Sequence, residues 1–314
     1  MIISKERLIQ EADSIGFRAE ILEKVLMLIY LLEAFSKDEF LKEKLALKGG
    51  TALNLFYFEL ARLSVDLDLN YIGYIDRENM LKERPEIESR IERICFKSNF
   101  ILYRKPSVHA GGKMIWRYPS VLGNQSNIEI DLNFMYRVPL IPITKKDSFT
   151  VAGQKAQGIS ILDIHELAAG KLSALIDRGA SRDIFDAHYL FHRIKLDDFI
   201  LRPLFVIYAG MSKKTDLRTI EKLIITENTT EFKNRLLPLL SRKLIFAKTW
   251  SKNLIHECQE QFSRLLPLKE NEHEFLTRLF DHNELKPELI CGEKLAKLVK
   301  QHPALHWRMR KVLK

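Results

Sequence analysis

Two aspartates stand two positions apart in an otherwise apolar segment, and their types and spacing are suited to metal chemistry. Asp66 and Asp68 alternate with Val65, Leu67 and Leu69. In a β-strand this alternation directs both carboxylates to one face and the aliphatic side chains to the other. Two such close negative charges repel unless a cation binds between them, and proteins hold Mg²⁺ with one or two carboxylates plus substrate phosphates. The pair predicts a metal site, although a solvated strand face shows the same alternation.

A pair of glycines precedes the acidic segment and has the form of a phosphate-binding turn. Gly49 and Gly50 follow a short apolar stretch and Lys48, and a helix is expected from Thr51 to about Ala61. Glycine lets the backbone approach a ligand closely, and a helix N-terminus offers N–H donors and a positive dipole end to an anion. A lone Gly-Gly is also common in ordinary turns. The helix and the Asp-x-Asp pair that follow favour a site for nucleotide phosphates.

These residues together resemble a known signature. Leu47-Lys48-Gly49-Gly50-Thr51 followed by Arg62-x-Ser64-x-Asp66-Leu67-Asp68 is similar to the nucleotidyltransferase superfamily and, more narrowly, to the AbiEii/AbiGii toxin family of bacterial toxin–antitoxin systems. The resemblance implies an α/β (α+β) fold with a polymerase-β-like core and a mixed sheet. It also implies an NTP substrate, with Mg²⁺ or Mn²⁺ as cofactor, and places Lys48, Gly49, Gly50, Thr51 and Ser64 at the nucleotide.

A third carboxylate is expected on a neighbouring strand. Glu129 and Asp131 alternate with aliphatic residues, so both project from one face of an expected strand. The superfamily pattern implies that one of them completes the metal site or accepts the proton of the attacking hydroxyl. Asp131 is the better match, with Glu129 in reserve, while a solvated outer face is the alternative.

A second group of charged residues lies further along the chain. Asp163 and Glu166 have the form of a helix N-terminal cap. The helix that follows carries Lys171, and the next one carries Arg182 and Asp183. This order resembles the downstream motif of the toxin family, which implies that Lys171 binds phosphate, that Asp183 is essential and that Arg182 contacts the nucleotide. The alternative is a set of surface salt bridges within these helices.

Two histidines on the second of these helices, His188 and His192, are four residues apart, a spacing found in zinc sites. No third ligand follows nearby, and the glutamate of a His-Glu-x-x-His motif is missing. We interpret them as histidines at the edge of the core.

Composition restricts the class of protein. The chain has 314 residues, a net charge of +9 and a pI near 9.3. Such a balance favours a polyanionic partner, and RNA is the natural one for a protein that handles nucleotides. Two basic segments near the C-terminus, 294–300 and 308–314, are candidates for phosphate contacts. The alternative is a solvated C-terminal helix. No apolar run reaches the length of a membrane span and no signal peptide begins the chain, so we expect a cytoplasmic protein without membrane contact.

The pattern along the chain predicts two domains. Residues 1–160 are expected to form the catalytic domain with N-terminal helices, and residues 161–314 a helical domain that completes an active-site cleft. Expected strands cover 45–47, 65–71, 100–105, 113–118 and 127–134. Expected helices cover 76–99, with a break or late start near Pro85, and 217–225, 231–250, 254–265, 272–280 and 293–300.

The resemblance implies a toxin that transfers a nucleoside monophosphate from an NTP to an acceptor hydroxyl, with a tRNA 3′ end as the expected acceptor and a cognate antitoxin as a possible partner. Two alternatives stay open at this point. One is transfer to a hydroxyl on a protein, and the other is a nucleotide-binding module without turnover. The intact Asp-x-Asp pair argues against the second.

Overall fold

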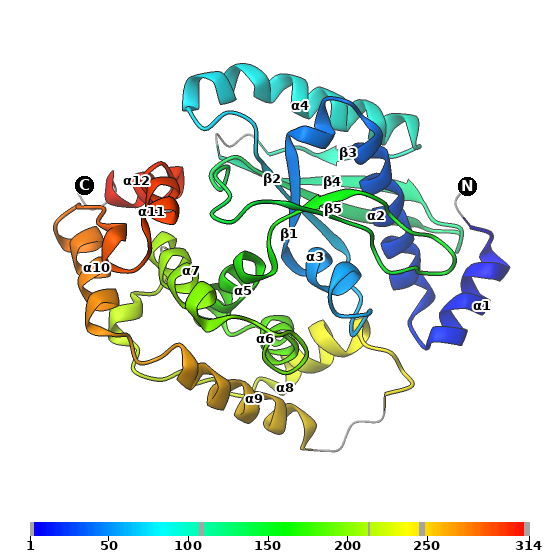
Figure 1. Ribbon diagram of the computed structural model, residues 1–314. Coiled ribbons are helices and arrows are strands. Elements are labelled where there is room, and N and C mark those ends of the chain that lie inside the picture. Colours follow the sequence, from blue (N-terminus) through cyan, green and yellow to red (C-terminus); the bar gives the residue numbers. More distant parts are fainter. Residues whose placement is uncertain (1–2, 107–109, 213, 245–248, 311–314) are drawn as a thin grey trace. The chain divides into compact units, whose positions relative to one another are not determined.

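The fold was examined in a computed structural model, which describes residues 3–106, 110–212, 214–244 and 249–310 (Figure 1). The last four residues of the basic C-terminal end, 311–314, lie outside the described residues. The chain forms two compact units. The first comprises Met1–Arg137, Ile143–Leu162 and Pro238–Ile245, and the second Val138–Pro142, Asp163–Leu237 and Phe246–Lys314.

The first unit is built on a seven-stranded mixed sheet with the order β3-β4-β5-β2-β1-β7-β6. Its strands are β1 (Leu45–Lys48), β2 (Asp66–Tyr71), β3 (Ile101–Arg104), β4 (Gly111–Pro119), β5 (Gln125–Asn133), β6 (Thr144–Lys146) and β7 (Ile159–Ile161). β2 pairs parallel with β5 and antiparallel with β1, and β1 pairs parallel with β7. The expected mixed sheet is thus confirmed.

The two faces of this sheet differ in polarity. Ile128 and Ile130 of β5 and Trp116 of β4 are buried on the apolar face. The helix α4 (Arg77–Lys97) covers this face through Phe96, whose ring lies 5.5 Å from that of Trp116. The helix α2 (Ala19–Lys37) covers it through Glu23, which accepts a hydrogen bond from Tyr118 of β4. The carboxylates that alternate with these apolar residues therefore lie on the opposite face.

The remaining helices of the first unit are α1 (Lys5–Ile15) and α3 (Gly49–Phe56). The expected extension of α3 to Ala61 is wrong, because Glu59 and Leu60 have positive φ angles of 49° and 63°, which a right-handed helix excludes. The expected break near Pro85 is also wrong, since α4 runs continuously through it. Burial of Ile87 and Ile91 in the same helix offsets the single lost hydrogen bond.

The second unit is helical in its described part. It contains α5 (Ile164–Arg178), α6 (Ser181–Arg193), α7 (Asp198–Met211), α8 (Thr229–Glu231), α9 (Trp250–Gln261), α10 (Glu270–Asp281), α11 (Glu293–Lys300) and α12 (Pro303–Arg310). Asp163 caps α5 by accepting from the His165 backbone N–H at 2.8 Å, as expected. Glu166 is instead buried and accepts hydrogen bonds from the backbone N–H groups of Leu140 and Ile141.

Several expected boundaries in this unit are corrected. The helix α7 was not expected, because its almost uniformly apolar C-terminal half has no helical periodicity to detect. In place of a helix over 217–225 there is only a short turn, η2 (Leu217–Thr219). In place of one helix over 231–250, α8 continues into a π-helical segment, η3 (Phe232–Leu236), and a 3₁₀ turn, η4 (Leu237–Leu239). Residues 240–244 are not helical, and 245–248 lie outside the described residues. No helix in the described ranges combines the length and apolarity needed to span a bilayer.

Candidate active site

The acidic residues of the first unit occupy neighbouring positions on two strands. In the parallel pair of β2 and β5, Asp66 lies beside Glu129 and Asp68 beside Asp131. Residues paired in register share a face of the sheet, and all four are only partly buried. The sheet thus brings a third and a fourth carboxylate to the Asp-x-Asp pair, and Asp131 is the one directly beside Asp68.

The glycine turn lies against the same carboxylates. Lys48 at the end of β1 is opposite Asp68, and Gly49 then begins α3 with a φ angle of +72°. A Cβ atom on Gly49 would lie 2.1 Å from Oδ2 of Asp68, so the carboxylate covers the glycine directly. Thr51 fixes the turn to β2 by donating its hydroxyl hydrogen bond to the Asp66 carbonyl. The turn and the acidic strand therefore form one site.

The N-terminus of α3 offers backbone donors at this point. The N-cap residue of the helix is Lys48, and its side chain makes no capping hydrogen bond. Its first N–H groups are not satisfied within the helix, which makes them suitable donors to an anion such as phosphate. Lys48 adds a positive charge, and its ammonium lies 5.4 Å from the centre of the Tyr136 ring.

Ser64 and Arg62 pack against the second glycine. A Cβ atom on Gly50 would lie 2.7 Å from Nη2 of Arg62 and 3.0 Å from Oγ of Ser64. Asn54 supports this arrangement, since its amide donates to the Gly50 carbonyl at 2.9 Å and its oxygen accepts from the Arg62 backbone N–H at 3.3 Å. Arg62 is buried, so its guanidinium is part of the site. In the sequence it stands out only as one position of the motif.

Lys113 is a further charged residue beside these carboxylates and was not among the expected site residues. It lies on β4 opposite Asp131, and its ammonium forms an ion pair with Glu129 at 2.5 Å. Burial lowers the pKa of Lys113, but the hydrogen bond with Glu129 and the negative charges of Asp66, Glu129 and Asp68 outweigh this and raise it. Lys113 therefore adds a positive charge beside these acidic residues, and Glu129 is already paired with it. No local pattern marked this lysine, because its partners lie on other strands.

The residues present fit a divalent cation. Within the described part of the chain, the carboxylates of Asp66, Asp68 and Asp131 are not gathered within 4.8 Å of one another. Their backbones are nevertheless adjacent in register on one face, and carboxylate oxygens are the ligands that Mg²⁺ and Mn²⁺ prefer.

The charged residues of the second unit form a compact cluster within that unit. The Lys171 ammonium on α5 lies 3.0 Å from Asp183 and 2.9 Å from Asp186 of α6, and the Arg178 guanidinium donates to Asp183. The side chain of Asp183 is 1% exposed and that of Lys171 10%. Burial raises the pKa of Asp183, but the charges and hydrogen bonds of Lys171 and Arg178 outweigh it and hold the pKa well below its usual range. Arg182 lies half-buried in the first turn of α6.

Replacing Asp183 by Asn is expected to destabilise the second unit by about 3 kcal/mol, because it leaves Arg178 and Lys171 without their shared buried carboxylate. Urea unfolding of the wild-type chain and of Asp183→Asn measures the difference in the free energy of unfolding. Asp198→Asn is the control, since Asp198 forms a half-exposed pair with Arg264 and its loss should cost at most about 1 kcal/mol. Equal losses for the two variants would contradict the argument.

The same carboxylate gives stability a pH dependence of known sign. Because the pKa of Asp183 is lower in the folded than in the unfolded chain, its contribution is present above the unfolded pKa of about 3.9. It is lost as the pH falls below that value. Unfolding measured between about pH 5 and pH 2 should therefore show a steeper loss for the wild-type chain than for Asp183→Asn.

The comparisons with known proteins identify the family and the fold. The family model described as Nucleotidyl transferase AbiEii toxin, Type IV TA system, matches residues 30–272. No curated protein sequence matches the chain. Among solved structures, MenT4, a nucleotidyltransferase toxin from Mycobacterium tuberculosis H37Rv, is similar with a TM-score of 0.65 and 15% identity, over 98% of this chain and 99% of that one.

At this identity the structural likeness shows the fold alone, and the expected nucleotidyltransferase fold is thereby confirmed. The family match is independent of it, covers well over half of the chain and includes the glycine turn and the carboxylates on β2 and β5. The chain therefore belongs to the AbiEii family of nucleotidyltransferase toxins of type IV toxin–antitoxin systems.

Proposed function

We propose that this chain transfers a nucleoside monophosphate from an NTP to an acceptor hydroxyl and releases pyrophosphate. The observation that carries the proposal is the position of the Asp68 carboxylate directly over Gly49, at the N-terminus of α3. A triphosphate bound by the first N–H groups of α3 lies next to the acidic face of β2. The phosphate-binding and metal-binding groups then act on one substrate.

Each residue of this site has a proposed role. Gly49, Gly50 and Thr51 provide the backbone donors for the phosphates, and Lys48 and Ser64 add a charge and a hydroxyl. Asp66, Asp68 and Asp131 would hold a divalent cation, Mg²⁺ or Mn²⁺, which when bound supplies charge neutralisation at the phosphates. Lys171 and Arg182 of the second unit are proposed to assist nucleotide binding, as the family resemblance implies.

In the reaction, the acceptor oxygen attacks the α-phosphorus, the bond from that phosphorus to the bridging oxygen of the β-phosphate breaks, and pyrophosphate leaves. The hydroxyl proton passes to a carboxylate. Asp131 is favoured over Asp183 for this role, because Asp131 is partly exposed beside Asp68 whereas Asp183 is buried and already bound to Lys171 and Arg178. Asp183 is proposed to position Lys171.

The acceptor is proposed to be a tRNA 3′ end, in the cytoplasm, with a cognate antitoxin as the partner that restrains the activity. The family resemblance implies this acceptor, and the net charge of +9 supports a polyanionic substrate. The relative transfer of label from the four NTPs measures which base is preferred.

The test is transfer of label from each of the four α-labelled NTPs to total RNA in the presence of Mg²⁺. Nuclease-sensitive labelling that is lost in Asp66→Ala is the expected result. Label that survives Asp66→Ala excludes the mechanism. Nuclease-resistant label that migrates with protein identifies a protein acceptor instead, and NTP binding without pyrophosphate release in the presence of total RNA identifies a module without turnover.

A further inference from the structure

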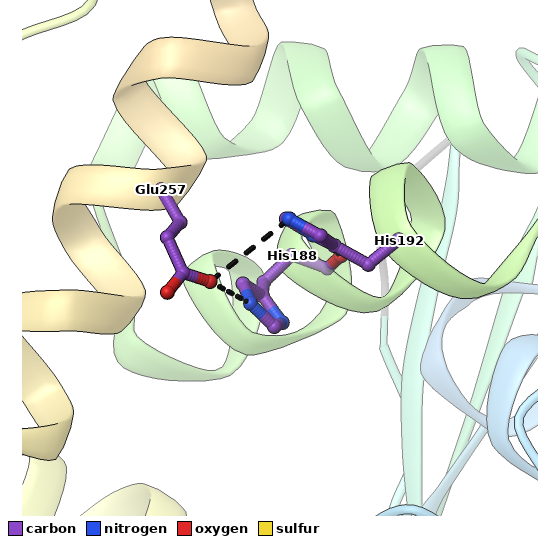
Figure 2. Close-up of side chains that lie close together, drawn as sticks. All are labelled: His188, His192 and Glu257. Carbon is purple, nitrogen blue, oxygen red and sulfur yellow. Dashed lines mark hydrogen bonds and ion pairs between the residues drawn. The ribbon is translucent and has the colours of Figure 1, made fainter.

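A second possible metal site lies in the second unit, on two helices that are far apart in the sequence. His188 and His192 stand one turn apart on α6, and Glu257 stands on α9. Nε2 of His188 lies 2.7 Å from Oε2 of Glu257, and Nε2 of His192 lies 3.9 Å from the same oxygen. Figure 2 shows both imidazoles facing this carboxylate. One ligand atom from each residue falls within 4.8 Å of the other two.

The hydrogen bonding of His192 leaves a lone pair facing the carboxylate. Its Nδ1 lies 2.8 Å from the His188 backbone carbonyl, which can only accept, so the ring proton is on Nδ1. In the neutral ring, Nε2 is therefore an acceptor and faces the acceptor oxygen of Glu257. Two acceptors facing each other repel, and a bound cation removes that repulsion. A ring proton anchored on a backbone carbonyl is also the usual arrangement for a metal-binding histidine.

His188 is suited to the same role. Nε2 of His188 donates to the Glu257 carboxylate at 2.7 Å, while no described residue bonds to its buried Nδ1, so the ring proton can move to Nδ1 when Nε2 binds an ion. Neutral imidazole is the form that binds metal ions.

We propose that His188, His192 and Glu257 bind a zinc ion that links α6 to α9. Two imidazole nitrogens and one carboxylate oxygen are a common ligand set for zinc, with solvent in the fourth position. The side chains of His192 and Glu257 are 36% and 46% exposed, which gives an ion and a water molecule access. The nitrogens need only small side-chain movements to reach Zn–N distances of about 2.0–2.1 Å. Mg²⁺ would not compete well, because it prefers oxygen ligands.

The site has a structural consequence for the second unit. The helix α6 also carries Asp183 and Asp186, which bind Lys171. A zinc ion that links α6 to α9 therefore restrains the helix that holds this ion-pair cluster. The sequence alone favours core-edge positions for the two histidines. The third proposed ligand, Glu257, follows His192 by 65 residues, so no local spacing reveals it.

The test is zinc binding to the metal-free full chain, measured by competition with a chromogenic chelator in a buffer that contains Mg²⁺. One zinc per chain is expected, and His188→Ala, His192→Ala and Glu257→Gln should each weaken it at least about tenfold. His256→Ala is the matched control, because His256 is the neighbour of Glu257 on α9 but its side chain is 72% exposed and pairs with Glu260. Asp66→Asn combined with Asp68→Asn should leave zinc binding unchanged.

A measurement on the wild-type chain guards against variants that fail to fold. Zinc added to a buffer that already contains Mg²⁺ should raise the melting temperature further, because zinc binds only the folded arrangement of α6 and α9. The proposal is overturned if the wild-type chain binds no zinc more tightly than the His188→Ala, His192→Ala double variant. It is also overturned if His256→Ala weakens binding as much as the three ligand variants do, or if zinc leaves the melting temperature of the wild-type chain unchanged.

Discussion

Asp68→Asn is expected to reduce nucleotide transfer at least about a thousandfold, equivalent to about 4 kcal/mol in the barrier. Asparagine keeps the shape of the side chain but removes the negative charge nearest to Gly49. The divalent cation then loses a charged ligand at the point where the phosphates bind. Initial rates with saturating NTP and Mg²⁺ measure the effect.

The fold should survive this change. Asp68 lies beside Asp131 on a face that also carries Asp66 and Glu129. Removing one of several like charges reduces their repulsion, so the melting temperature should stay the same or rise. A variant that loses activity together with several degrees of melting temperature would assign Asp68 a structural role instead.

The neighbouring carboxylates provide the internal control. Asp131→Asn should lower the rate at least about a hundredfold, because it removes the proposed third ligand and proton acceptor. Glu129→Gln should lower it less than about tenfold, since Glu129 is already paired with Lys113 at 2.5 Å. The reverse order would make Glu129 the third carboxylate.

Gly49→Ala is expected to abolish detectable transfer, with a loss of at least about a hundredfold. Two independent reasons apply. The φ angle of +72° is unfavourable for any residue with a Cβ, and that Cβ would lie 2.1 Å from Oδ2 of Asp68. The carboxylate must move away, which separates the phosphate-binding and metal-binding groups.

The variant Gly158→Ala separates the effect of backbone strain from the effect of displacing the Asp68 carboxylate. Gly158 has a similar φ angle of +63°, but no described atom lies within 4 Å of the position of its Cβ. It should lose about 1 kcal/mol of stability, measured by urea unfolding, and keep its activity. Gly50→Ala should fall between the two, because its Cβ meets the end of the flexible Arg62 side chain at 2.7 Å. Equal activity of Gly49→Ala and Gly158→Ala would show that nucleotide transfer does not require the Asp68 carboxylate at its position over Gly49.

Local sequence patterns were sufficient to predict how the residues of β2 and of the glycine turn are arranged. Alternation with a period of two is a local property, so Asp66 and Asp68 had to share a face once β2 formed. The glycine turn could also be predicted from the sequence, because a positive φ angle and a close approach of another group both favour glycine. Amphipathic helices with clear ends were recognised for the same reason, and α11 spans the expected residues 293–300.

The residues that join these local patterns from distant parts of the chain could not be predicted without the packing of the strands and helices. The sheet order places β5 beside β2 and so brings Asp131 to Asp68, and β4 brings in Lys113. The packing of α9 on α6 brings Glu257 to His188. Such contacts depend on strand order and helix packing, which arise from the burial of apolar surface across the whole unit and leave no periodic trace near any one residue.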